Sequence, residues 1–150
     1  MQYEKVTTIY DDCKDNKYNF ALGDGSISTS SPGYFAKPTI IDNPPPTSRI
    51  VTEEPFGPIV PVQIWDDEDD VIARANDTKF GLGASVFSKD VDRAKRIAGR
   101  LQAGTVWINS GAKFLPTGYF AGQKESGLGG EGGQLGVMQY LNAQTIYEYK

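Results

Sequence analysis

The chain has 150 residues, the size of one ordinary domain, and a chain of this length buries about 68–70% of its unfolded surface. Hydrophobic residues make up 39% and charged residues 23%, a composition that excludes wholesale disorder. The net charge of −4 excludes the basic surface of a nucleic-acid-binding protein. The sequence has no histidine, which excludes a Ser-His-Asp or Cys-His catalytic unit within the chain and any histidine-ligated metal site.

The cellular compartment is indicated by the single cysteine and by the lack of long apolar runs. Cys13 has no partner for an internal disulfide, which is typical of a reducing compartment. No apolar run approaches the length of a membrane span, and the first residues lack the pattern of a signal peptide. We therefore expect a cytoplasmic protein that contacts neither membranes nor nucleic acid.

The first part of the chain alternates short apolar segments with turns. A helix is predicted over residues 1–15, with Val6, Ile9 and Tyr10 on one side. Small polar residues predict a loop over 26–32. Strand-forming residues are concentrated in three segments, 18–22, 38–41 and 59–65.

The middle of the chain has the pattern of successive strand–helix–strand units. Acidic residues in the first turn predict a helix over 66–76, and Asp90 is placed to cap a second helix that ends near residue 101. Strands are predicted to follow these helices, within 80–87 and over 105–109. Two such units in succession imply parallel strands with right-handed crossovers, and therefore an α/β fold with a mostly parallel sheet and flanking helices.

The last part of the chain differs in amino-acid composition from the middle. Residues 110–133 are rich in glycine with interspersed aromatic residues, and loops of this length are usually functional. A short helix is predicted around 134–141, and the β-prone segment 145–149 is predicted to be a strand. Because that strand lies at a terminus, we expect its edge to be exposed.

Three patterns suggest sites, and each has a plainer interpretation. The glycine spacing of 127–132 matches a dinucleotide-binding fingerprint, but no apolar strand precedes it and no βαβ unit follows it. The acidic run 66–70 lacks the alternating ligands and central glycine of a calcium loop. Cys13 lies among acidic residues that raise the pKa of its thiol, so an inert helix cysteine is the better interpretation.

The segment 53–58, Glu-Glu-Pro-Phe-Gly-Pro, is the strongest local signal in the sequence. Its prolines and glycine predict a stiff turn that projects a carboxylate and an aromatic ring. A carboxylate accepts hydrogen bonds from a sugar diol, and a flat ring beside it stacks on a planar ligand. From the residues alone, a purely structural turn is an equally good interpretation.

The same segment resembles the E-E-x-F-G-P motif of the aldehyde dehydrogenase superfamily. Further matches follow in the family's order, at Asn76, 80–82, 86–90, 101–109, Lys124, 126–127, Gly129 and Glu131. Upstream, residues 33–39 resemble the family's G-Y-F-x-x-P-T segment. The resemblance covers essentially the whole chain. It implies a truncated catalytic-domain fold over residues 1–142, followed by an oligomerisation strand over 143–150.

The resemblance also implies roles for individual side chains. Glu54 matches the glutamate that holds the nicotinamide ribose, and Phe56 matches the aromatic residue packed near the nicotinamide. Phe114 and Phe120 match positions that line the aldehyde tunnel in many members. The terminal strand resembles one that joins another subunit's sheet, so we expect a homo-oligomer, most simply a dimer.

Other parts of the family's machinery are not matched. The resemblance places the nucleophilic cysteine, the water-activating glutamate and the NAD(P)-binding domain before Met1, and Cys13 does not align with the nucleophile. The usual P-F-G-G-x-K is Y-F-A-G-Q-K at 119–124, and the usual G-R-E is G-G-E at 129–131. The loop differences put its standard main-chain path and inter-subunit contacts in doubt, and the absence of an aligned cysteine and cofactor domain predicts that the isolated chain uses no NAD(P).

Three hypotheses about function follow. The favoured one is a stand-alone descendant of the family that binds a small molecule, or catalyses a new reaction, without NAD-dependent aldehyde oxidation of its own. The alternatives are the C-terminal portion of an NAD(P)-dependent aldehyde dehydrogenase, active only with its missing portion, and an oligomerisation module. For a new reaction, Glu54 is the first candidate catalytic residue. Further candidates for acid–base work are Glu125, Glu131, Tyr119 and Lys124.

Overall fold

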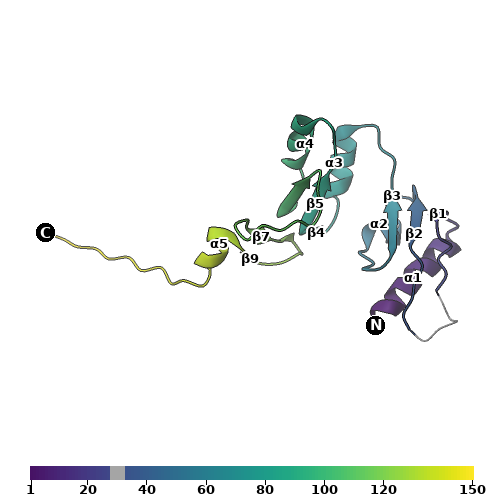
Figure 1. Cartoon of the computed structure of the whole chain (residues 1–150), viewed down its shortest axis with the longest axis horizontal. Helices are drawn as coiled ribbons and strands as arrows, with labels where there is room; N and C mark the ends of the chain where they lie inside the picture. The colour runs from purple at the N-terminus through teal and green to yellow at the C-terminus, as the bar shows by residue number, and fades with distance from the viewer. Residues whose placement is uncertain (28–32) are drawn as a thin grey trace. The chain divides into compact units, whose positions relative to one another are not determined.

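The computed structural model describes residues 1–27 and 33–150 and divides the chain into two compact units, residues 1–67 and 68–150 (Figure 1). Each unit has its own helices and small sheets. The loop predicted over 26–32 lies largely outside the described residues.

In the first unit, a helix packs on a three-stranded sheet (Figure 1). The helix is α1 (Gln2–Asp15), and the strands, in sheet order, are β1 (Asn19–Leu22), β2 (Thr39–Asp42) and β3 (Ile59–Val62). β1 and β2 are antiparallel, whereas β2 and β3 are parallel. A single helical turn, α2 (Arg49–Thr52), leads into the segment 53–58.

The spacing of apolar residues explains why α1 forms the core of this unit. Intervals of three and four place one row of side chains on a single helix face, and that face is buried. The row and its partners on the sheet and α2 are Val6, Ile9, Tyr10, Cys13, Ile41, Ile50 and Ile59. The Tyr10 hydroxyl donates a hydrogen bond to the main-chain oxygen of Lys37 at 2.7 Å, so its buried polar end is satisfied.

The second unit is built from shorter elements. They are α3 (Glu68–Asn76), β4 (Phe80–Gly81), β5 (Gly83–Val86), α4 (Val91–Ala98), β6 (Thr105–Ile108), β7 (Phe120–Ala121), β8 (Gln123–Lys124), β9 (Gly130–Glu131) and α5 (Gly133–Met138). β5 and β6 are parallel, whereas the pairs β4–β8 and β7–β9 are antiparallel. The unit is therefore a set of small strand pairs with flanking helices.

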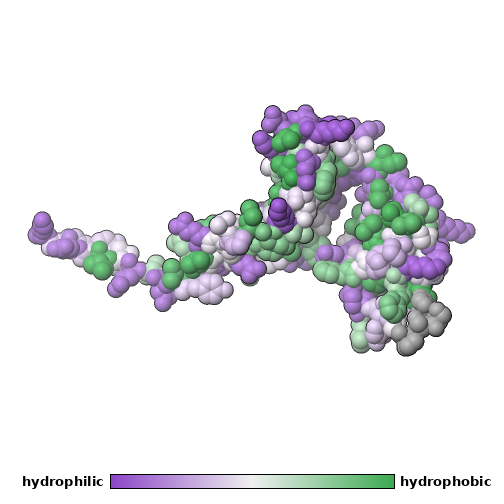
Figure 2. Space-filling model, viewed as in Figure 1, coloured by the Kyte–Doolittle hydropathy of each residue, from purple (hydrophilic) through white to green (hydrophobic). Residues whose placement is uncertain are grey.

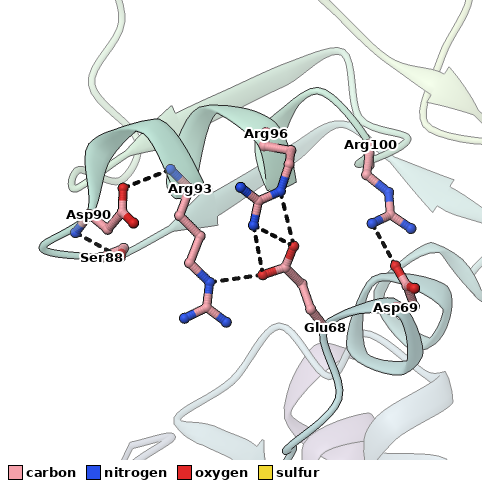
Figure 3. Close-up of polar contacts among 7 residues, drawn as sticks. All are labelled: Glu68, Asp69, Ser88, Asp90, Arg93, Arg96 and Arg100. Carbon is pink, nitrogen blue, oxygen red and sulfur yellow. Dashed lines mark hydrogen bonds and ion pairs between the residues drawn. The ribbon is translucent and has the colours of Figure 1, made fainter.

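Charged side chains join α3 to α4 (Figure 3). The Glu68 carboxylate accepts hydrogen bonds from Arg93 at 2.8 Å and from Arg96 at 2.9 Å, and Asp69 pairs with Arg100 at 2.7 Å. Hydrogen bonds from the two guanidinium groups are the main cause of a lowered pKa at Glu68. As the sequence predicted, Asp90 caps α4, because its side chain accepts a hydrogen bond from the main-chain N–H of Arg93 at 2.9 Å.

The α/β fold class and the flanking helices are confirmed, but the described strands form several small sheets, in which β2–β3 and β5–β6 are the parallel pairs, rather than one mostly parallel sheet. The strand predicted over 59–65 is β3, and it pairs with β2 rather than with a strand in 80–87. The predicted parallel unit over 80–109 is present as β5–α4–β6. The helix predicted around 134–141 is the shorter α5.

The terminal segment is exposed and belongs to no helix or strand. A strand is defined by its partner, and the segment 145–149 has none among the described residues. The oligomerisation strand over 143–150 thus stays a prediction. In the part of the chain that the structure describes, no helix is both long and apolar enough to cross a membrane.

Each unit also exposes apolar side chains, seen as green surface in Figure 2. In the first unit, Val60 and Val62 of β3 are about half exposed. In the second unit, Leu135 and Val137 of α5 are more than half exposed.

Candidate functional site

The segment 53–58 is held in place by polar side chains from the first turns of α1. The Lys5 ammonium donates a hydrogen bond to the main-chain oxygen of Glu54 at 2.9 Å. The side-chain amide of Gln2 donates to the main-chain oxygens of Pro55 and, at 3.2 Å, of Phe56. Three successive carbonyl groups of the turn are therefore bound to one helix, which fixes the path of its main chain.

Two further features show how tightly this turn is constrained. Phe56 has a φ of +47°, a left-handed conformation that costs a bulky residue about 1–2 kcal/mol. A Cβ atom on Gly57 would lie 2.5 Å from Cγ2 of Val6, so a glycine is required where the turn crosses α1. Strain of this kind persists only where surrounding contacts enforce it, and it clusters at functional sites.

The two glutamates of the segment have different surroundings. The Glu53 carboxylate accepts a hydrogen bond from Arg49 at 2.8 Å and so closes the end of α2. The Glu54 side chain is exposed, and its carboxylate has no hydrogen-bond or ion-pair partner among the described residues. The turn thus uses the main chain of Glu54 for structure and leaves its carboxylate available to a ligand.

Phe56 borders an apolar cavity of about 340 Å³ that lies within the first unit. The rings of Tyr3 and Tyr34 meet edge to face across its wall, with centroids 5.1 Å apart. The Phe56 ring is 73% exposed, although phenylalanine is usually buried. An exposed flat ring beside an apolar hollow is a suitable surface for a planar ligand group.

The other two predicted site residues lie in the second unit, in an aromatic trio. Phe114 is edge-on to Trp107 at 5.7 Å and edge-on to Phe120 at 4.9 Å. The indole N–H of Trp107 donates to the main-chain oxygen of Lys113 at 2.8 Å, which ties the loop before β7 to β6. The structure therefore brings Phe114 and Phe120 together, as expected of residues that line one wall.

The additional acid–base candidates mostly have structural partners. The Lys124 ammonium donates hydrogen bonds to the main-chain oxygens of Asn76 at 2.7 Å and Thr78 at 2.9 Å, at the C-terminal end of α3. Glu125 pairs with Lys79 at 3.6 Å. The Tyr119 hydroxyl accepts a weak hydrogen bond from Gln139 at 3.3 Å. Glu131 is exposed on β9.

Cys13 is fully buried in α1. Burial is the main cause that raises the pKa of its thiol to about 11, and the neighbouring Asp12 carboxylate adds to the effect. The structure thus places Cys13 in the core and agrees with its interpretation as a residue without a catalytic role, although the sequence indicated only the acidic neighbours as a cause of the raised pKa. Among the described residues, no group of three or more cysteine and acidic side chains is arranged to hold a metal ion.

Sequence reasoning missed the residues that hold these sites. Gln2 and Lys5 contact a turn some 50 positions away, so no local pattern could indicate them. Asn76 was matched only as a motif residue. Its side-chain amide donates to the main-chain oxygen of Arg100 at 2.9 Å and accepts from the N–H of Gln102 at 2.8 Å, which joins the ends of α3 and α4.

Comparisons with known proteins agree with this arrangement. The family model for the aldehyde dehydrogenase family matches residues 1–146. Betaine aldehyde dehydrogenase from Brucella anthropi is 39% identical over 148 residues, which are 97% of this chain and 30% of that protein. Chloroplastic betaine aldehyde dehydrogenase from Amaranthus hypochondriacus is 37% identical over 145 residues, 97% of this chain and 29% of that protein.

Solved structures give the same result. A crystal structure of a betaine aldehyde dehydrogenase variant from Staphylococcus aureus matches with a TM-score of 0.88 and 36% identity, over 95% of this chain and 29% of that one. The Staphylococcus aureus enzyme in complex with NAD+ matches with a TM-score of 0.85 and 37% identity, over 93% of this chain and 28% of that one. The chain thus spans about 30% of the length of these relatives, and it belongs to the aldehyde dehydrogenase family.

Proposed function

We propose that the chain forms the C-terminal part of the active site of an NAD(P)-dependent aldehyde dehydrogenase, which oxidises an aldehyde to a carboxylic acid. The observation that supports this most directly is the exposed Glu54 carboxylate, which has no partner among the described residues, beside the exposed Phe56 side chain on a turn that α1 holds in a strained conformation.

The residues of this turn fit a nicotinamide cofactor. A carboxylate with two free oxygens accepts hydrogen bonds from both hydroxyls of a ribose diol, and Glu54 offers such a group. The exposed ring of Phe56 provides a flat apolar surface for a planar heterocycle. When bound, NAD(P)+ supplies the hydride acceptor of the reaction. The role of this chain is to hold and orient the ribose end.

The aromatic trio of the second unit suits the aldehyde side of such a reaction. Trp107, Phe114 and Phe120 form a continuous apolar surface. Surfaces of this kind exclude water and bind the hydrocarbon part of a substrate, but they carry no group that transfers a proton. We propose that Phe114 and Phe120 line the aldehyde path and contribute to substrate choice.

On its own, the chain is proposed to be inactive as a dehydrogenase. The reaction needs a thiolate to attack the aldehyde, and the single cysteine of the chain is buried, which raises the pKa of its thiol to about 11. The nucleophile, the water-activating glutamate and the cofactor domain would come from a further portion of the protein. Because the chain spans about 30% of the length of its relatives, we favour a part of a larger enzyme over a stand-alone domain.

A chimera tests the proposal. The C-terminal 30% of the Brucella anthropi betaine aldehyde dehydrogenase is replaced by this chain, and NADH formation from betaine aldehyde is followed by absorbance. A chimera that folds, by circular dichroism and a single thermal transition, is expected to form NADH. Glu54→Gln is expected to raise the KM for NAD+ at least about tenfold, because one charged hydrogen-bond acceptor is lost. Asp11→Asn, which replaces an exposed carboxylate of α1 outside the turn, serves as the matched control. A folded but inactive chimera would refute the proposal.

The cavity of about 340 Å³ in the first unit supports a second candidate, a stand-alone small-molecule-binding protein. In that case the 150-residue chain should form a defined homo-oligomer, most simply a dimer that covers its exposed apolar residues. Native mass spectrometry of the purified chain distinguishes the two. A defined dimer that retains a small molecule favours the second candidate, and a chain that forms no defined oligomer and retains no small molecule favours the first.

A further inference from the structure

β7 and β9 are an antiparallel pair with β8 between them in the sequence. We call this pair the β7–β9 hairpin, and three positions in and next to it share one small volume. Gly130 of β9 lies opposite Ala121 of β7 in the strand register. A Cβ atom on Gly130 would lie 2.5 Å from Cβ of Ala121 and 2.8 Å from Cζ of Tyr119, and it would also clash with the main-chain oxygen of Phe120. Real Cβ atoms do not make contacts this short. The main chain of Phe120 and the side chains of Tyr119 and Ala121 together occupy the room that a side chain at 130 would need.

The same contacts show that the two strands are unusually close. Opposed residues in antiparallel strands ordinarily have Cβ atoms about 4.5–5.5 Å apart, so the hairpin has the present spacing only because residue 130 is a glycine. The side-chain amide of Gln139, just after α5, donates to the main-chain oxygen of Gly130 at 2.6 Å and to the Tyr119 hydroxyl at 3.3 Å. One amide thus ties both strands of the hairpin to the end of α5.

Phe120 lies between Tyr119 and Ala121 in β7, so the spacing of the hairpin sets its position. Its ring is edge-on to Phe114, which in turn is edge-on to Trp107. A change in the path of β7 moves Phe120 and opens this trio. The position of the aromatic trio thus depends on Tyr119 and Ala121, which are not part of it.

We infer that Tyr119 is a positioning residue for Phe120, and that the residues at positions 119, 121 and 130 are coupled through their packing. The ring of Tyr119 fills the place of an absent side chain at 130 and holds β7 close to β9, which keeps Phe120 against Phe114. The three departures from the family pattern in this loop then depend on one another, and none can be reversed alone. This inference concerns the chain's own packing and holds whether or not the chain takes part in aldehyde oxidation.

The chain offers a local reporter for the test. Trp65 and Trp107 are its two tryptophans, one in each unit. In the full 150-residue chain carrying Trp65→Phe, the remaining Trp107 reports on the trio. Its emission is measured at 20 °C, with the far-ultraviolet circular dichroism as a check that the variant is folded, and the thermal midpoint is measured in the same samples.

Gly130→Ala is expected to lower the thermal midpoint by about 5 °C or more and to shift Trp107 emission to longer wavelength, since the strands must separate. Tyr119→Ala should give the same spectral shift, whereas Tyr119→Phe keeps the ring and should change the midpoint by less than about 2 °C. Combining Gly130→Ala with Ala121→Gly should lower the midpoint by less than the sum of the two single changes.

Gly111→Ala is the matched control, because a Cβ there has no neighbour closer than 3.7 Å. It should leave both signals unchanged. If Gly130→Ala behaves like Gly111→Ala, or if Tyr119→Ala leaves Trp107 emission at its parent value, the inference is wrong. If Gly130→Ala does not fold, the Tyr119 variants decide the outcome, since they add no atoms to the hairpin.

Discussion

The segment 53–58 of the first unit and the β7–β9 hairpin of the second both contain predicted site residues, but they are held in different ways. In segment 53–58, α1 binds the main chain through Gln2 and Lys5, and the side chains of Glu54 and Phe56 stay free. In the hairpin, the side chains of Tyr119 and Ala121 fill the space between the strands.

The difference has a consequence for sequence change. A turn that is held through its carbonyl groups keeps its conformation when an exposed side chain is replaced. The exposed side chains of such a turn can therefore suit a ligand without being constrained by packing. A hairpin held through side-chain packing accepts only sets of residues that fit together. This agrees with the sequence, since 53–58 matches the family motif whereas 119–124 and 129–131 depart from it at several positions.

The largest effect is expected at Gly57, where segment 53–58 packs closely against Val6 of α1. Gly57→Ala places a methyl group 2.5 Å from Val6 and should lower the free energy of unfolding of the first unit by about 1–3 kcal/mol. Urea unfolding is followed through Trp65 in a Trp107→Phe background, which reports on this unit alone. Adding Val6→Ala should recover part of the loss. An unchanged urea midpoint for Gly57→Ala would show that packing against α1 does not constrain the turn.

A smaller effect is expected from the loss of the hydrogen bond between Lys5 and the main chain of segment 53–58. Lys5→Met keeps the length of the side chain but removes the hydrogen bond to the Glu54 carbonyl, and should cost about 1 kcal/mol of unfolding free energy in the same Trp65 assay. Lys89→Met, at an exposed position in the second unit, is the control and should be neutral. Equal urea midpoints for the two variants would mean that the turn is held by packing alone, as in the hairpin.

The smallest effect is expected from the α3–α4 ion pairs, as a dependence on pH. Arg93 and Arg96 lower the pKa of Glu68 below its ordinary 4.5, so the folded unit binds fewer protons than the unfolded one. The stabilisation is fully present above about pH 4.5 and is lost as the pH falls through the lowered value. Glu68→Gln should therefore reduce the acid sensitivity of urea unfolding followed through Trp107. If parent and variant lose stability in parallel between about pH 6 and pH 3, Glu68 makes no such contribution.

Sequence patterns were sufficient to predict the elements in which apolar or capping side chains stand at the spacing of a helix or strand. The apolar row of α1, the Asp90 cap of α4 and the parallel β5–α4–β6 unit were all predicted from local spacing. The two-residue strands β4, β7, β8 and β9 were not, because such short pairs have no periodicity. Contacts between residues far apart in the sequence fix them, such as the bond from the main-chain N–H of Gly81 to the side-chain hydroxyl of Ser126 at 2.8 Å.

The candidate site was predicted in part for the same reason. The motif indicated Glu54 and Phe56, and the aromatic content of the loop indicated Phe114 and Phe120 once the resemblance was known. The partner of β3 was predicted wrongly, since an apolar strand reveals its burial but not its neighbour. The braces from Gln2 and Lys5 were missed because they join residues 49 to 54 positions apart.

The bonds of Lys124 to the end of α3 bear on the order in which the second unit folds. They join residues that are 46 and 48 positions apart, so the loop between them must close before either bond forms. The β5–α4–β6 unit lies inside that loop and has more local contacts, so it should assemble first. Docking of residues 123–126 is then a late step, and the N–H groups of Gly81 and Glu125 should gain protection from hydrogen exchange after those of β6.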